Sequence, residues 1–181
     1  IHPVDLIADA AGVTVERTRN NRTVTLNPAI GFNAVPNDLL TFSVPVINRG
    51  IHTSPSTNLK VTGPDGFTET TYVPSLYSLQ EQRVELNWVV PAGQQIGNAG
   101  LVFVVDEAEE ITNDGNRSNN MGTFSLYIGR LPIANLSINS PIQTFETASL
   151  NGLSSVDPDG GLLDCVFEIE TTTGNMQLIE D

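Results

Sequence analysis

The feature that most constrains this chain is an alternation of apolar and polar side chains with a period of two. In residues 83–90 the apolar side chains of Val84, Leu86, Trp88 and Val90 occupy every second position, with polar residues between them. Successive side chains of a β-strand point to opposite faces, so this pattern predicts a strand with one buried face. The same alternation recurs at residues 42–46, 124–128 and, more weakly, 101–105.

Turn-forming residues separate these runs, and no helical pattern competes with them. Residues 36–38, 63–66 and 113–116 are rich in Pro, Gly, Asn and Asp, which preset a bend or tolerate positive φ. No window carries apolar residues at helical spacing between capping residues. The sequence therefore predicts an all-β, immunoglobulin-like antiparallel β-sandwich. The arginine-rich residues 16–33 are predicted to form an inserted hairpin or a long loop.

A domain boundary is predicted near residues 129–132, where one strand ends and Pro132 opens the next segment. Residues 1–130 form the first β-sandwich in this interpretation, and residues 131–181 form a second β domain. The second segment has about half of the residues that a free-standing sandwich needs. We therefore expect a partial second β-sandwich that is truncated, poorly ordered or completed by another chain.

The charge of the chain argues against one class of partner. Acidic residues number 21 against 8 basic ones, Lys60 is the only lysine, and the formal net charge is −13. Phosphate binding needs clustered Lys and Arg, so nucleic acid is not an expected partner. No apolar run approaches the ~20 residues of a membrane helix, so no membrane span is predicted. The chain begins at Ile1 without Met, and we expect any signal peptide to lie upstream or to have been removed.

Cys165 is the single cysteine and cannot form a bridge within the chain. Two interpretations stay open. It pairs with a cysteine beyond residue 181 in an oxidising compartment, or it is a small buried side chain on a strand.

Four stretches of the first domain occur in a recognisable order. They are an opening strand at residues 4–7, a second strand with an Asn-x-Gly turn at 40–50, a tryptophan strand at 84–91, and an "Asp … Ile … Asn-Asn" signature at 104–120. Together they resemble the CARDB module, the cell-adhesion-related domain found in bacteria and archaea. That family usually carries glutamates just before the paired asparagines, where this chain has residues 114–117.

The second domain shows a different resemblance. Residues 132–135, 154–161 and 165–169 resemble the first strand, the turn and the next strand of a PKD-type domain, a family named after polycystic kidney disease proteins. The tryptophan usual in that next strand is missing. Both resemblances imply spacers or adhesive modules on surface proteins and exported enzymes, and neither implies catalysis.

No catalytic constellation is visible in the sequence. His2 and His52 are the only histidines, and neither lies in a His-Glu-x-x-His pattern. His52 lies in a loop rich in Ser, Thr and Pro, where we expect it to be exposed. A function must be argued from a site, so we predict no catalytic residue and no enzyme activity for this segment.

Two acidic loops are candidates for calcium, which takes six to eight oxygen ligands. The candidate ligands are Asp106, Glu107, Glu109 and Asp114 in the first domain and Asp157 and Asp159 in the second. Neither loop has the regular spacing of acidic residues that fixes a calcium loop. Solvated turns are the competing and preferred interpretation. No cofactor other than calcium is predicted.

Asparagines suggest two further roles. Asn21, Asn116 and Asn135 each begin an Asn-x-Ser/Thr triplet and are candidate glycosylation sites. The pair Asn119 and Asn120 is expected to hydrogen-bond loop backbone and to fix the entry of the last strand of the first domain.

These features favour a non-catalytic structural or adhesive module of a larger exported or cell-surface protein, with Trp88 in its core rather than on an exposed sugar platform. The expected partners are neighbouring domains of the same polypeptide, other surface proteins, glycans or identical subunits. Two alternatives remain: a subunit of an extracellular filament assembled by strand exchange, and an accessory module of a secreted hydrolase.

Overall fold

The structure is a computed structural model that describes residues 2–29, 31–139, 149–160, 163, 166–170 and 176–180. It divides into two compact units, Ile1–Gly129 and Arg130–Asp181, called unit 1 and unit 2 below. Cys165 lies outside the described residues. Within the described part of the chain, no helix has the length and apolar character required to cross a membrane.

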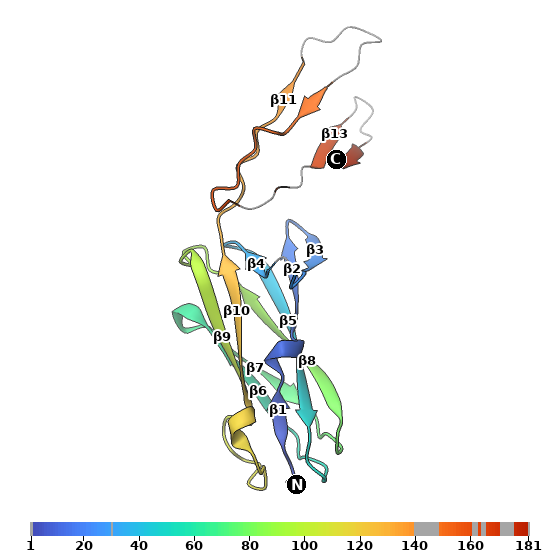
Figure 1. Cartoon of the computed structure of the whole chain (residues 1–181), viewed down its shortest axis with the longest axis vertical. Helices are drawn as coiled ribbons and strands as arrows, with labels where there is room; N and C mark the ends of the chain where they lie inside the picture. Colours follow the sequence, from blue (N-terminus) through green and yellow to red (C-terminus); the bar gives the residue numbers. More distant parts are fainter. Residues whose placement is uncertain are drawn as a thin grey trace. The chain divides into compact units, whose positions relative to one another are not determined.

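The first sheet of unit 1 is built around one long central strand, β5 (Figure 1). Its strands are β1 (Leu6–Ala8), β2 (Thr14–Arg19), β3 (Arg22–Thr25), β5 (Leu39–Asn48) and β8 (Glu81–Val89). All of them pair antiparallel, with β8 along one edge of β5 and both β1 and β2 along the other. Strand β3 extends the sheet beyond β2.

The edge of β5 that carries β1 and β2 is interrupted at Pro45, which has no backbone N–H to donate. The 3₁₀ helix η1 (Ala10–Gly12) links β1 to β2 at this point. The Asp9 amide donates to the Pro45 carbonyl (3.0 Å), and the Asp9 carboxylate caps η1 through the Ala11 amide (3.2 Å). One edge of β5 therefore pairs with two short strands rather than one.

The arginine-rich segment 16–33 contains a hairpin, as the sequence predicted, formed by β2 and β3. Its two turn residues, Asn20 and Asn21, have φ values of 49° and 61°, the left-handed conformation that two-residue hairpins require and that Asn tolerates. The hairpin is not wholly an insertion, because β2 also pairs with β5 and so belongs to the sheet.

The second sheet packs against the first. It contains β4 (Asn33–Ala34), β10 (Met121–Ile128), β9 (Gly97–Val105), β6 (Thr57–Thr62) and β7 (Thr68–Val73), in that spatial order. Strand β4 pairs parallel to β10, and the other pairs are antiparallel. Two further 3₁₀ helices, η2 (Pro64–Gly66) and η3 (Arg117–Asn119), lie in loops.

The inward side chains of both sheets form one apolar core. Phe42 from the first sheet contacts Phe103 and Phe124 from the second, with ring centroids 6.1 and 5.9 Å away. Trp88 is 2% exposed and packs against Phe67 at 5.4 Å between centroids. The predicted immunoglobulin-like antiparallel sandwich and the core position of Trp88 are confirmed.

Unit 2 contains two separate two-stranded sheets in its described residues. They are β11 (Ser137–Ile138) with β12 (Leu150–Asn151), and β13 (Val166–Glu170) with β14 (Met176–Glu180). An isolated antiparallel bridge joins Ile133 to Val156. Both of these side chains are exposed, and so are Leu131, Leu136 and Leu153. The described part of unit 2 therefore leaves much of its apolar surface in contact with water.

Candidate functional site

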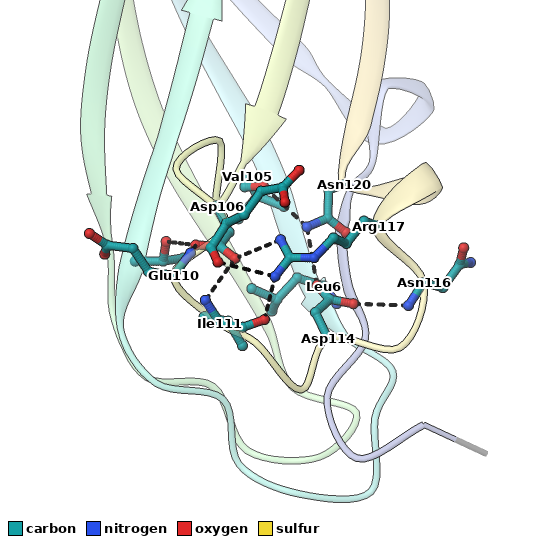
Figure 2. Close-up of polar contacts among 11 residues, drawn as sticks. Leu6, Val105, Asp106, Glu110, Ile111, Asp114, Asn116, Arg117 and Asn120 are labelled. Atoms are coloured by element: carbon teal, nitrogen blue, oxygen red, sulfur yellow. Dashed lines mark hydrogen bonds and ion pairs between the residues drawn. The ribbon is translucent and has the colours of Figure 1, made fainter.

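A polar cluster fills the loop between β9 and β10, residues 106–120, at the end of unit 1 where the chain enters (Figure 2). We call this cluster the loop clasp; it consists of Asp106, Asp114, Arg117 and Asn120. Two of the predicted calcium ligands belong to it, so its geometry bears directly on what the loop can do.

Asp106 directly follows β9 in the left-handed conformation, with φ of 54°, and its side chain is buried. Its Oδ1 accepts hydrogen bonds from the Glu110 amide and the Thr57 hydroxyl, both at 3.1 Å. Its Oδ2 accepts from the Ile111 amide at 3.1 Å and from Arg117 at 3.3 Å. A buried carboxylate is costly unless its oxygens are paired, and four donors from this fold pair this one.

Arg117 supplies the positive charge of the loop clasp. Besides the ion pair with Asp106, its Nη2 donates to the carbonyl oxygens of Ile111 at 2.7 Å and of Glu109 at 3.3 Å. A planar guanidinium can serve several acceptors at once, which a lysine cannot do with the same geometry. Arg117 therefore ties the two ends of the 106–111 turn together.

Asp114 joins the loop to the first strand. Its Oδ2 accepts from the Leu6 amide at 3.4 Å and from the Asn120 side-chain amide at 3.1 Å, while its Oδ1 accepts from the Asn116 amide at 3.1 Å. The Asn120 amide also donates to the Val105 carbonyl at 3.2 Å. Asn120 thus fixes the entry of β10 through a backbone contact, as predicted, whereas its neighbour Asn119 donates to a side chain, Asp5, at 2.8 Å.

A second buried asparagine organises the same end of unit 1. The Asn48 side-chain amide donates to the carbonyls of His52 and Leu76, and its oxygen accepts from the Gly50 amide at 3.0 Å. Gly50 lies against the first strand so closely that an added Cβ would come within 2.5 Å of the Val4 Cα. Only glycine fits there, which explains the Asn-x-Gly turn. His52 is exposed, as predicted.

At the opposite end of unit 1 a buried aspartate pairs with a partly exposed arginine. The Asp38 carboxylate accepts two hydrogen bonds from Arg19, at 2.6 and 2.7 Å, and one from the Val35 amide at 2.8 Å. Neighbouring Arg17 donates to the Asn33 carbonyl at 3.4 Å. Burial, and secondarily the charge of Arg19, lower the pKa of Arg17 below its usual value. These contacts anchor the β2–β3 hairpin, and no pattern in the sequence predicted them.

The other predicted calcium ligands make contacts of their own within each unit. Glu107 is exposed and pairs with Lys60 at 2.6 Å, and the Glu109 side chain is also exposed. In unit 2, Asp157 accepts from the Asp159 amide at 2.8 Å, and Asp159 pairs with Arg130 at 3.9 Å. Among the described residues no three His, Cys, Asp or Glu side chains converge as a metal site requires. Calcium binding stays a prediction.

The three candidate glycosylation sites differ in accessibility. Asn21 is exposed at the tip of the β2–β3 hairpin, and Asn135 is exposed in unit 2. Asn116 is half-buried, and its side-chain oxygen accepts a hydrogen bond from the Ser118 hydroxyl at 2.6 Å. A glycosylating enzyme would have to bind both of these residues. Modification of each stays a prediction, with Asn21 and Asn135 the more accessible acceptors.

The loop clasp contains two carboxylates, one side-chain amide and one guanidinium, which are paired with one another and with the backbone. This arrangement is suited to holding a loop. Fold and clasp together define an immunoglobulin-like β-sandwich module. Residues 4–124 match the CARDB family model, and the chain belongs to that family. This confirms the family resemblance of the first domain.

The chain is also similar to domains of known structure. The CARDB domain of the PF1109 protein from Pyrococcus furiosus, in complex with di-metal ions, is 24% identical, with a TM-score of 0.51 over 71% of this chain and 96% of that one. This similarity shows the fold. A domain of a predicted cell surface protein from Methanosarcina acetivorans is 25% identical over 71% of this chain and 93% of that one, with a TM-score of 0.48. A comparison with curated proteins gave no match.

Proposed function

We propose that this chain is a non-catalytic spacer or adhesive module of a larger exported or cell-surface protein. The proposal rests on one observation: the polypeptide enters unit 1 at one end of the sandwich and leaves it at the other. It enters at Val4, which bridges to Asp114 in the loop clasp, and it leaves at Gly129, whose amide donates to Ala34 at the far end of β10. Figure 1 shows the start of β1 and the tip of β10 at opposite ends of the sandwich.

Entry and exit at opposite ends make a module that adds its length to a chain of modules. Strand β10 alone, at eight residues, spans about 27 Å. A force applied to the two ends loads the β1–β5 and β9–β10 hydrogen bonds along the strands, so that several must break together. The loop clasp fastens the entry end, because Asp114 holds the Leu6 amide of β1.

Single-molecule pulling tests this proposal. Force is applied through cysteines introduced next to Val4 and Gly129, with Cys165 replaced by Ser. The matched control pulls the same protein through Asn21 and Gly129, which lie at the same end of unit 1, so that strands peel apart one bond at a time. We expect the first geometry to unfold unit 1 at distinctly higher force than the control. Equal unfolding forces in the two geometries would contradict a load-bearing spacer.

A second candidate function rests on unit 2. We infer that residues 131–181 are the start of a PKD-type domain, which the antiparallel pairing of Ile133 with Val156 supports. Exposed apolar side chains such as Leu136 and Leu153 favour a partner that completes this unit, either further chain or a strand from an identical subunit. Light scattering separates the two, since strand exchange produces a ladder of assemblies and an ordinary module stays discrete.

A further inference from the structure

The outward side of the second sheet differs in charge from the rest of unit 1. We call it the neutral face: the outward positions of β10, β9, β6 and β7, which alternate with the buried core positions of these strands. Lys60 is the single charged residue among them, and it is neutralised by Glu107 at 2.6 Å. The other positions carry Thr, Ser, Asn, Gly, Val, Met or Tyr.

The strand register places these uncharged residues in continuous rows. Thr123 on β10 lies opposite Val102 on β9, which lies opposite Thr62 on β6, which lies opposite Thr68 on β7. Directly opposed residues on one face are close enough to contact each other. A row without charge therefore crosses four adjacent strands.

The outward side of the first sheet provides the contrast. Strand β8 presents Glu81, Arg83 and Glu85 to water, and β2 presents Glu16. The chain as a whole carries a formal net charge of −13. The neutral face is thus a local exception on an acidic molecule, and it also exposes large side chains: Met121 is 56% exposed and Tyr72 is 64% exposed.

We propose that the neutral face binds the neutral face of a second copy of this chain. Two strongly acidic molecules repel each other wherever their acidic surfaces approach, and this face is where they can meet without placing like charges together. A patch that binds its own copy does so about a twofold axis, so each residue near the axis meets its own counterpart.

The size of the face predicts weak association. Four strands about 4.8 Å apart and roughly seven residues long cover on the order of 500 Å² per copy. A dimer would bury about 1,000 Å² in total, below the range of standard stable interfaces. We therefore expect reversible dimers with a dissociation constant on the order of 100 μM, and dense arrays on a surface would favour them by effective concentration.

Sedimentation equilibrium of the whole chain, from about 10 μM to about 1 mM, tests the proposal. The average mass should rise from that of the monomer towards twice that value. Thr123→Arg and Met121→Glu each put a charge into a face that offers no opposite charge to pair with it, and both should hold the mass at the monomer value. Thr14→Arg is the matched control, because it changes an exposed strand threonine of the first sheet. It should associate like the unchanged protein, and melting curves should show all three variants folded.

Salt gives an independent readout. Added salt screens the repulsion between two acidic molecules, so association through a neutral face should strengthen as salt rises. Association through pairs of opposite charges would weaken instead. A chain that stays monomeric at the highest concentration overturns the proposal, as does a dimer that Thr123→Arg leaves intact or that salt dissociates. None of these results depends on the pulling experiment, so the spacer function can fail or stand separately.

Discussion

The loop clasp predicts a large loss of stability when Asp106 becomes Asn. Asparagine has the same shape and tolerates the left-handed φ of 54° at this position, so the backbone conformation is preserved. The change removes the charge that pairs with Arg117 and turns one acceptor into a donor that faces the Ile111 amide or the Glu110 amide. Hydrogen bonds to a charged group contribute about 1.5–3 kcal/mol each, so the loss should be about 3 kcal/mol.

Urea denaturation followed by tryptophan fluorescence measures this loss, because Trp88 is the single tryptophan and lies in the core of unit 1. With a slope of about 2 kcal/mol/M, the midpoint should fall by about 1.5 M, and the melting temperature by about 10 °C. Asp65→Asn is the matched control, since Asp65 also has a φ of 54° but is exposed. It should change stability by less than about 0.5 kcal/mol. If Asp106→Asn and Asp65→Asn both have the urea midpoint of the unchanged protein, the clasp does not stabilise the fold.

Trp88→Ala should cost about 3–5 kcal/mol in far-UV circular dichroism melts, whereas Val89→Ala, at a 61% exposed position of the same strand, should cost little; equal effects would refute the proposed core. Gly50→Ala should destabilise unit 1 by about 2 kcal/mol or more, because its Cβ would clash with Val4. Gly93→Ala, in an open turn, is the control and should be tolerated. A Gly50→Ala variant of unchanged stability would show that the first strand does not pack there. Millimolar calcium or a chelator should change the melting temperature by less than about 1 °C, because hydrogen-bond donors of the protein already pair with the Asp106 and Asp114 carboxylates. A rise of several degrees on adding calcium would establish a calcium site.

The strands of unit 1 could be predicted because their signal is local. Alternation at residues 83–90 depends only on which side of one strand is buried, and the same holds for β5 and β10. The pairing partners of the arginine-rich segment could not be predicted, because its contacts with Asp38 and Asn33 join residues from different elements. Nothing in the local pattern of Arg17 or Arg19 distinguishes a solvent-exposed hairpin from one anchored to the sandwich.

The acidic loop shows why residue types alone do not decide the chemistry of a loop. Calcium and a hydrogen-bonded loop both require oxygens that converge, so Asp106 and Asp114 fit either interpretation from sequence. The two interpretations differ in what compensates the negative charge of the carboxylates: a bound calcium ion, or a positive side chain and hydrogen-bond donors of the protein itself. Which of these lies near the carboxylates depends on how the rest of the loop folds back onto them. Here Arg117 of the same loop provides that charge, and its guanidinium contacts the Asp106 carboxylate at 3.3 Å. A cation bound at that oxygen would have to displace a charge that the chain already provides, so replacing Arg117 is the change most able to make the loop dependent on a metal.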